Sequence, residues 1–324
     1  MFYFKQQKLE GLTIRILLTS DWHLRTSNPE NRTDPSFFET QLGKIEQILN
    51  IAVENKCKHI LQAGDFTDSP RPSFSLIEDY VSLFKKYNIG ERIELLHVFG
   101  QHDTYFRTKE RTATKLFNFL GYIKEVSGLM RLTEDIHLYG ASWGEEIPKI
   151  EDMDAFNILL IHKTITDKPL WVGHDDFLQS DKLFKNNPYD IIHCGDNHHP
   201  VFYKNKNQVI VGCGSIVRKT ISESDLTPHV LLITINDNDL AYTLKKIELK
   251  YEPADKVFKP EALSREVNVE NAKMITFIES IKSNSISKNL DFKKNLENLL
   301  ISIEQPIKDI IMEELNERIK ENDR

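Results

Sequence analysis

Cysteine is scarce in this chain of 324 residues, and the sequence contains no long run of apolar residues. The three cysteines cannot all pair within one chain and show no Cys-x-x-Cys spacing, which argues against a disulfide framework or a structural zinc site. No apolar stretch approaches the roughly 18 residues that a membrane span needs, and the N-terminal stretch MFYFKQQKLEGL lacks the layout of a signal peptide. We therefore expect a soluble, cytoplasmic protein with no membrane partner.

Basic residues are also fewer than acidic ones. The formal net charge is −7 at pH 7, from 42 Lys and Arg against 49 Asp and Glu. This balance argues against a surface that is basic all over, although a nucleic-acid enzyme can be acidic overall if its cations gather around one groove. A hydrophobic content of 40% can form one large core and a smaller appended unit, so we expect two domains.

What the sequence does contain is a regular series of short apolar runs with the length of β-strands. Two segments between them, 37–55 and 76–88, repeat apolar residues at steps of three and four and are predicted to be helices. Strand and helix alternate through the first 120 residues, which is typical of an α/β fold. Later runs lie closer together and are separated by turns such as KNKN and INDND, which favours some antiparallel pairs. The predicted strands are 13–19, 59–63, 93–99, 136–141, 157–161, 190–194, 208–212 and 230–235.

The texture of the chain changes near residue 251, where a segment rich in proline and charge begins. We therefore predict a domain over 1–250 and a C-terminal capping and helical region over 251–324. The segments 272–282, 291–304 and 306–322 carry amphipathic patterns. In the last of them, Ile307, Ile311, Leu315 and Ile319 form a stripe that either packs on the chain's own body or binds a partner.

Residues that can bind a metal or carry a proton follow five of the predicted strands. Because the carboxyl ends of strands in an α/β sheet converge on one crevice, these side chains are expected to form a metal site. Taken singly, a histidine beside a strand is more often a hydrogen-bonded core residue, and Asp68 could be only a helix cap. The ordered set is Asp21 and His23, Asp65, the stretch GQHD at 100–103, His162, and Asp196 with His198 and His199.

This ordered pattern resembles that of the calcineurin-like metallophosphoesterases over about residues 20–215. The resemblance implies an α/β fold of two mixed β-sheets flanked by helices, and phosphoester hydrolysis with two metal ions. Within that superfamily, the stretches SDWHL (20–24) and GDFTDSPRPS (64–73) and the helical C-terminal region look most like SbcD-type nuclease subunits of DNA double-strand-break repair.

Carried over residue by residue, the resemblance assigns Asp21, His23, Asp65 and His198 to one metal, with Asp65 bridging to a second. Gln101, His162 and Asp196 are then the remaining ligands of the second metal. Oxygen and imidazole ligands without thiolate suit Mn²⁺, and Mg²⁺, Fe²⁺ or Zn²⁺ could also occupy such a site.

The same resemblance makes His102 the histidine that does not bind metal. It would protonate the leaving oxygen or stabilise its charge, and Asp103 would accept a hydrogen bond from the ring and fix its tautomer.

Two positions depart from the superfamily pattern. Gln101 stands where asparagine is usual, which keeps the amide oxygen but adds a methylene group. Asp196 stands in place of a histidine. A further carboxylate would favour Mn²⁺ or Mg²⁺ over zinc. Alternatively, a shifted loop could place His199 in the site, or the chain could be an inactive scaffold.

Basic residues lie within a few positions of the ligand loops. They could contact phosphates along a DNA groove, or they could be ordinary solvated loop charges. Tyr105 and Phe106 could pack on a sugar or base, or anchor their loop. The candidate DNA contacts are Arg25, Arg107, Lys109, Arg111, Arg218 and Lys219, with Arg32 and Arg71 nearby.

Three functions follow from these observations. The leading one is a Mn²⁺-dependent DNA nuclease that cuts from ends and acts as a homodimer with an SbcC-like ABC ATPase docked on the C-terminal helices. The second is a stand-alone metallophosphatase or cyclic-nucleotide phosphodiesterase. The third is a non-catalytic DNA-end-binding subunit.

Overall fold

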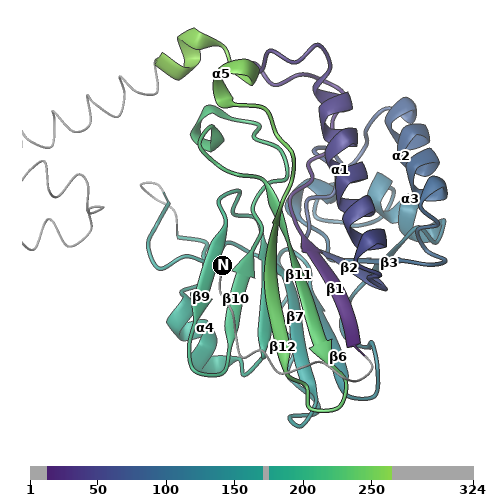
Figure 1. Ribbon diagram of the computed structural model, residues 1–324, viewed down its shortest axis with the longest axis vertical. Coiled ribbons are helices and arrows are strands. Elements are labelled where there is room, and N and C mark those ends of the chain that lie inside the picture. The colour runs from purple at the N-terminus through teal and green to yellow at the C-terminus, as the bar shows by residue number, and fades with distance from the viewer. Residues whose placement is uncertain (1–12, 171–174, 265–324) are drawn as a thin grey trace, which may run out of the picture. The chain divides into compact units, whose positions relative to one another are not determined.

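Two six-stranded mixed β-sheets form the framework of the computed structural model, which describes residues 13–170 and 175–264 (Figure 1). The first sheet has the order β12 (Tyr242–Glu248), β11 (His229–Asn236), β1 (Thr13–Thr19), β2 (His59–Gln62), β3 (Glu94–His97), β4 (Ile123–Glu125). The second has the order β5 (Gly128–Arg131), β6 (Ile136–Ala141), β7 (Phe156–His162), β8 (Ile191–Gly195), β10 (Val209–Gly212), β9 (Val201–Lys204).

Both sheets have a parallel centre. Strands β1 to β4 run parallel, as do β6, β7, β8 and β10. Strands β5, β9 and β11 pair antiparallel with this set, and β12 pairs antiparallel with β11. The KNKN turn joins β9 to β10 and the INDND turn lies between β11 and β12, which confirms the predicted antiparallel pairs.

The eight predicted strands are confirmed, and four further strands were not predicted. Strands β4, β5, β9 and β12 are short or only half-buried, so they lack a continuous apolar run. Three short helices were missed for the same reason, namely α3 (Ala113–Phe119), α4 (Ser180–Asn186) and α5 (Ala254–Val257).

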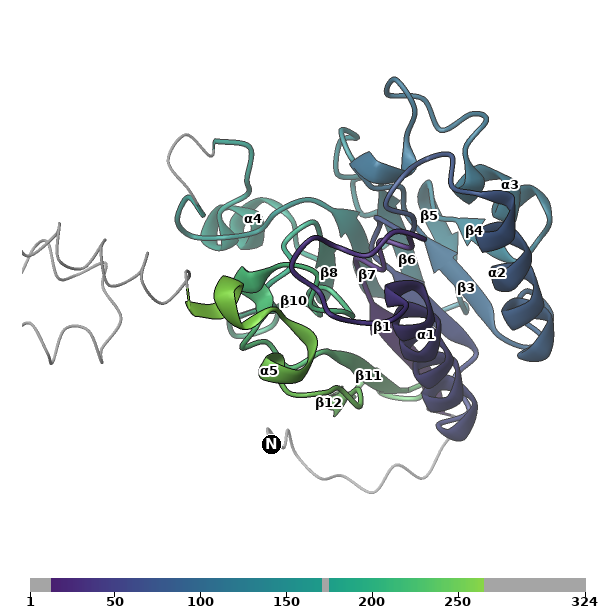
Figure 2. The ribbon, with the colours of Figure 1, turned by 90° about the horizontal axis from the view of Figure 1, so that it is seen from above.

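Helices cover the outer face of each sheet. Helices α1 (Phe37–Glu54), α2 (Phe74–Lys86) and α3 lie along the first sheet (Figure 2). Alternation along β1 shows how the sequence fills these layers. Ile16 and Leu18 point into the core between the two sheets, whereas Leu17 packs on the helix side. Ser36 and Ser73 cap α1 and α2 by accepting backbone N–H groups with their hydroxyls.

The chain divides into two compact units, Met1–Ala262 and Leu263–Arg324. Within the first unit, the segment after β12 is tied to the loop before α1, because Thr33 N–H donates to the Val257 carbonyl and Lys259 N–H donates to the Asn31 carbonyl. The predicted helices 272–282, 291–304 and 306–322 lie outside the described residues, and the domain division at residue 250 stays a prediction. No helix in the described part of the chain is both long enough and apolar enough to cross a bilayer.

Candidate metal centre

The site forms where five strands end. Asp21 and His23 follow β1, Asp65 follows β2, and His162 is the last residue of β7. The short 3₁₀ helix η1 (Gln101–Asp103) comes after β3, and Asp196 and His198 follow β8. Residues from both sheets therefore meet at one edge of the sandwich.

Backbone strain accompanies this convergence. Asp21, His23, Asp65 and Asp196 all have a positive φ, between 45° and 79°. Residues other than glycine adopt this region at a cost of about 1 kcal/mol or more each, so the surrounding contacts must hold them there. Two such contacts are backbone hydrogen bonds from the loop after β1 to the loop after β2, in which Asp21 N–H donates to the Gly64 carbonyl and His23 N–H donates to the Asp65 carbonyl.

Glycine is required where these loops touch. A Cβ atom at Gly100 would lie 2.0 Å from Asp65 Oδ1, and one at Gly64 would lie 2.2 Å from His162 Nδ1. Any other residue at these positions would displace a side chain of the site.

The histidines of the first predicted metal position face each other. His23 Nε2 lies 2.9 Å from His198 Nε2. Burial lowers the pKa of His23 to about 4, and burial raises the pKa of Asp21 to about 6. A dication between these side chains would favour neutral imidazole and ionised carboxylate, which are the forms that bind metals.

Asp65 has the geometry of a bridging ligand. Its Oδ1 accepts a hydrogen bond from His102 N–H at 3.0 Å, and its Oδ2 lies 3.6 Å from His23 Nε2 and 3.5 Å from His162 Nε2. Burial raises the pKa of Asp65, but the charge of His162 outweighs this and holds the pKa below its usual range. Within the described chain, Oδ2 of Asp65 and Oδ2 of Asp21 are buried without a hydrogen-bond partner.

His162 is oriented with one ring nitrogen toward the site. Its Nδ1 donates to the Ala63 carbonyl at 2.6 Å, which leaves Nε2 for the centre. Burial lowers the pKa of His162, but Asp65 first and then Asp21 and Asp196 outweigh it and raise the pKa to about 10. A cation bound at Nε2 would take the place of that proton.

Gln101 and Asp196 reach the second predicted metal position but bond to each other. Gln101 Nε2 donates to Asp196 Oδ1 at 2.7 Å, and Gln101 Oε1 lies 2.8 Å from His162 Nε2. The other oxygen of Asp196 accepts hydrogen bonds from the N–H and hydroxyl of Thr164. His199, the alternative ligand, is exposed and lies outside the groups of potential ligand atoms found in the described chain.

Two carboxylates lie beside the Nδ1 atoms of the histidines, on the side away from the metal position. The sequence pattern assigned neither of them this role. Glu223 Oε1 lies 2.6 Å from His198 Nδ1, and Glu223 is almost fully buried. Asp68 Oδ1 lies 3.5 Å from His23 Nδ1. Asp68 does not cap α2, because Ser73 does. Glu223 belongs to no recognisable motif and lies 25 residues after His198 in a polar stretch of the sequence.

The predicted hydrogen bond between the His102 ring and Asp103 is not formed. The carboxylate of Asp103 is buried and accepts hydrogen bonds from the N–H groups of Phe66 and Gly100 and from the Thr114 hydroxyl. The hydrogen-bond partner of His102 Nδ1 is the Asp68 carbonyl, at 3.1 Å. The prediction that Asp103 orients the ring is wrong, because a fully buried carboxylate in η1 is used to hold the loops together.

Five of the six candidate DNA contacts fall into three groups. Arg25 and Lys219 lie at the rim, each paired with Asp68, at 3.2 and 3.1 Å. Lys109 is paired with two glutamates at the base of its loop. Arg107 and Arg111 are exposed, and neither forms an ion pair within the described residues.

The prediction that Arg218 contacts DNA is wrong, because a DNA contact requires an accessible guanidinium. It is 5% exposed and donates to the carbonyls of Ser224 and Glu252. Arg32 is also buried, where it pairs with Asp34 and donates to the Arg218 carbonyl. Arg218, through the Glu252 carbonyl, and Arg32, which lies over the Phe258 ring, tie the segment after β12 to the rest of the first unit.

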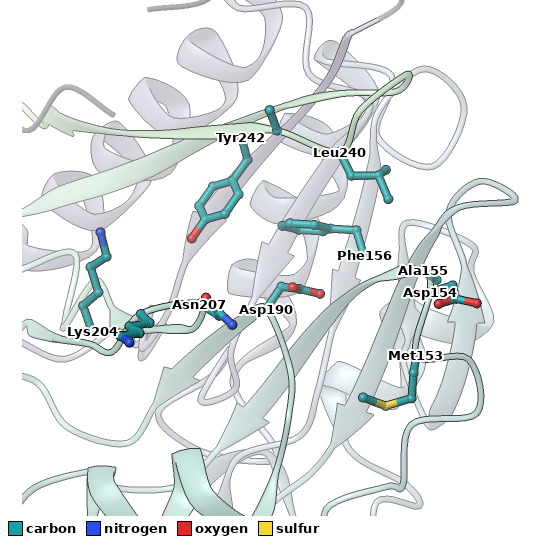
Figure 3. Close-up of a pocket in the computed structure, with 11 residues that line it drawn as sticks. Met153, Asp154, Ala155, Phe156, Asp190, Lys204, Asn207, Leu240 and Tyr242 are labelled. Atoms are coloured by element: carbon teal, nitrogen blue, oxygen red, sulfur yellow. The ribbon is translucent and has the colours of Figure 1, made fainter. Parts of the chain in front are cut away.

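A cavity of about 450 Å³ lies at the opposite edge of the second sheet (Figure 3). Phe156 and Asp190, which line it, stand at the starts of β7 and β8, whereas the site residues follow the ends of these strands. One such strand spans about 20 Å, so this cavity is separate from the metal centre.

The donor set fits a pair of divalent cations. Buried carboxylate oxygens without hydrogen-bond partners, and imidazoles whose other nitrogen is already bonded, are the arrangement of a metal site. Three overlapping groups each bring three ligand atoms within 4.8 Å of one another: Asp21, His23 and His198; His23, Asp65 and His102; Asp21, Asp65 and His162.

Comparison with known proteins agrees with this geometry. The family model described as calcineurin-like phosphoesterase matches residues 14–215, which is more than half of the chain.

Solved structures also match this chain, at low sequence identity. An archaeal phosphodiesterase is 13% identical over 73% of this chain and 100% of its own, with a TM-score of 0.39. A dimetal phosphatase from Danio rerio is 6% identical over 74% and 99%, with a TM-score of 0.47. Vacuolar protein sorting 29 from Cryptosporidium parvum is 12% identical over 74% and 99%, with a TM-score of 0.35. These likenesses select no substrate.

Proposed function

This chain belongs to the calcineurin-like phosphoesterase family, and we propose that within it the chain is a two-metal DNA nuclease of SbcD type. The observation that carries the nuclease proposal is the loop that follows His102. Arg107 and Arg111 lie exposed on it without ion pairs in the described chain, so they are available to backbone phosphates beside the site.

The chain's own residues divide the work of hydrolysis. Asp21, His23, Asp65, His162 and His198 would hold the metal pair, with Gln101 and Asp196 completing the second position once their mutual hydrogen bond opens. When bound, such a pair supplies an activated water and stabilises charge on the phosphoryl oxygens, and Mn²⁺ suits this oxygen-rich donor set.

We assign His102 to the protonation of the leaving oxygen. Its Nδ1 donates to the Asp68 carbonyl, which fixes the ring and leaves Nε2 for the substrate. Protonated at Nε2, it would donate that proton as the phosphoester bond breaks. His102 N–H also donates to Asp65 Oδ1, which couples the position of the ring to the bridging carboxylate.

The partner and assembly proposals concern other parts of the chain. We propose an SbcC-like ABC ATPase as the partner, docked on the helices predicted within 272–322, and a homodimer as the working form in DNA repair in the cytoplasm. A molecular mass equal to one chain at micromolar concentration in light scattering would argue against the dimer.

One observation favours a second candidate, a non-catalytic DNA-end-binding subunit. Asp196 is fully engaged by Gln101 and Thr164, which opposes occupation of the second metal position. A stand-alone metallophosphatase remains the outcome to expect if only small phosphoesters are turned over.

The test is degradation of end-labelled linear DNA with Mn²⁺, Mg²⁺ or EDTA. We expect Mn²⁺-dependent cleavage that falls about 10²- to 10⁴-fold in His102→Ala, because general acid catalysis contributes that much. Mn²⁺ binding measured by calorimetry should persist in this variant. His199→Ala, at the exposed neighbouring histidine, is the matched control and should cleave like the wild type.

The other outcomes separate the alternatives. Turnover of a small phosphoester without DNA cleavage would overturn the nuclease and favour the phosphatase. DNA binding without hydrolysis of either substrate would favour the end-binding subunit.

A further inference from the structure

A single turn beside the metal centre combines backbone strain with an exposed aromatic ring. Thr108 N–H donates to the Tyr105 carbonyl at 3.0 Å, and Tyr105 N–H donates back to the Thr108 carbonyl at 2.9 Å. The two central residues, Phe106 and Arg107, have φ values of 49° and 62°. These features define a type I′ turn, which normally carries asparagine and glycine because both central residues need a positive φ.

Nothing local explains the residues that occupy this turn. Phe106 is 86% exposed, although a phenylalanine gains stability by burial and is disfavoured at positive φ. Strain that persists at an exposed position next to a catalytic centre points to a function of the side chain, since the fold itself does not need it.

The turn is held rigidly. The Arg71 guanidinium lies 3.7 Å from the centre of the Tyr105 ring, and the Tyr105 and Phe106 rings lie 4.5 Å apart, nearly edge to face. At the end of the loop, Ala113 N–H donates to the Pro70 carbonyl. Lys109 pairs with glutamates on two neighbouring segments, so the base of the loop is fixed as well.

The turn also lies within reach of the reacting phosphate. Phe106 follows His102 by four residues, which places their Cα atoms no more than about 14 Å apart. A stacked strand advances about 3.4 Å per nucleotide and an unstacked strand advances further, so this distance spans at most about four nucleotides. Arg107 and Arg111 add unpaired positive charge on the same loop, which suits a nucleic-acid strand better than an apolar protein surface.

We propose that Phe106 is a stacking platform for an unpaired nucleobase of the substrate, within about four nucleotides of the scissile phosphate. Tyr105 and Arg71 hold the ring in place, and Arg107 contacts the neighbouring backbone phosphate. The proposal rests on the proposed nuclease function, and it narrows the substrate to strands with unpaired bases near the cut, such as frayed ends, overhangs or single strands.

The first test is binding, which needs no turnover. A single-stranded DNA oligonucleotide carrying 2-aminopurine is titrated with the full chain in EDTA, and both anisotropy and 2-aminopurine fluorescence are followed. We expect the wild type to quench the fluorescence, and Phe106→Ala to abolish the quenching and raise Kd roughly 5- to 100-fold, the range for loss of one base–aromatic stack. Phe106→Trp should restore both.

Phe119→Ala is the matched control. Phe119 is also 86% exposed, but it lies at the end of α3, away from the loop. It should bind and quench like the wild type. Equal loss in both variants would show a general surface effect and overturn the platform.

The second test locates the base. Oligonucleotides with one abasic position each are compared as substrates. In the wild type, kcat/KM should fall about 5- to 100-fold at one position within four nucleotides of the cut, and in Phe106→Ala the abasic and intact substrates should be cut alike. DNA cleavage with no such position, and no effect of Phe106→Ala on binding, would overturn the platform and leave the nuclease standing. No hydrolysis of any phosphoester by the wild type would instead refute the proposed nuclease, while the binding test still decides the platform.

Discussion

Two histidines of the metal centre, His162 and His198, have the ligand nitrogen selected by a hydrogen bond at the other ring nitrogen. The Ala63 carbonyl fixes His162 and the Glu223 carboxylate fixes His198, each at 2.6 Å. Such partners orient the ring and raise the basicity of the ligand. Glu223 is itself secured, because its other oxygen accepts N–H groups from Lys219 and Thr220.

Removal of Glu223 should therefore weaken metal binding. Burial raises the pKa of Glu223, but His198 outweighs it and holds the pKa below its usual range, so the side chain is a charged partner of that ring. We expect Glu223→Ala to raise Kd for Mn²⁺ about 10- to 100-fold. Glu223→Gln should lose less, because an amide oxygen still accepts the Nδ1 proton. Calorimetric titration with Mn²⁺ measures both.

Glu91→Gln, at an exposed turn remote from the site, serves as the control and should bind Mn²⁺ like the wild type. Unchanged affinity in Glu223→Ala would show that the contact with His198 has no bearing on the metal.

At the scale of elements, the loop between η1 and α3 contains backbone strain that lowers the stability of the protein. Glycine at the positive-φ positions of its turn would avoid this strain. Arg107 has a φ of 62° at the tip of the type I′ turn and makes no ion pair within the described residues. Residues other than glycine lose about 1 kcal/mol or more in this conformation. Replacing such a residue by glycine would relieve this strain in the folded protein. Glycine also increases the conformational entropy of the unfolded chain, which offsets part of the stabilisation.

Arg107→Gly should consequently stabilise the protein by about 0.5 to 1 kcal/mol. Urea unfolding at pH 7.5 measures the change. Thr108→Gly is the control in the same turn, since Thr108 has no positive φ and glycine there should destabilise by a similar amount. A loss of stability in Arg107→Gly would mean that the turn is not strained. Weaker binding of single-stranded DNA by the stabilised variant is expected, because a phosphate contact is lost.

At the scale of the molecule, the layer on the helix side of the first sheet contains a buried titratable group. His97, on β3, is fully buried, and its Nε2 has no hydrogen-bond partner within the described chain. Burial lowers the pKa of His97 to about 4, against about 6.5 in the unfolded chain. The unfolded chain binds this proton more readily than the folded protein does. Above pH 6.5 neither form is protonated at His97, and as the pH falls from 6.5 toward 4 protonation of the unfolded chain lowers the free energy of unfolding.

The free energy of unfolding should thus fall more steeply with acid in the wild type than in His97→Leu. Between pH 7.5 and pH 4.5 we expect the wild type to lose about 2 kcal/mol more than the variant. Urea titrations at four pH values measure this difference, and the titrations of other groups cancel in it. His199→Leu, at an exposed position, should follow the wild type. Parallel pH profiles for His97→Leu and the wild type would refute the assignment.

The sequence by itself determined the eight strands that carry continuous apolar runs, the α/β class and the order in which ligand residues appear. Alternation along strands such as β1 is a local property, and the ends of parallel strands must meet at one edge of a sheet. That is why the sequence pattern alone places Asp21, Asp65 and His162 together. The half-buried strands β9 and β12 escaped because their apolar signal is weak.

Only the tertiary structure decided which groups touch within that edge. His102 bonds to the Asp68 carbonyl and not to its neighbour Asp103, His198 meets Glu223, and Arg218 is buried instead of exposed. The partners of His102 and His198 lie 34 and 25 residues away in the chain, and their contacts depend on how loops from different strands pack. Periodicity and motif spacing report which face or edge a residue occupies. The distances between side chains arise from the packing of the two sheets, which no local pattern encodes.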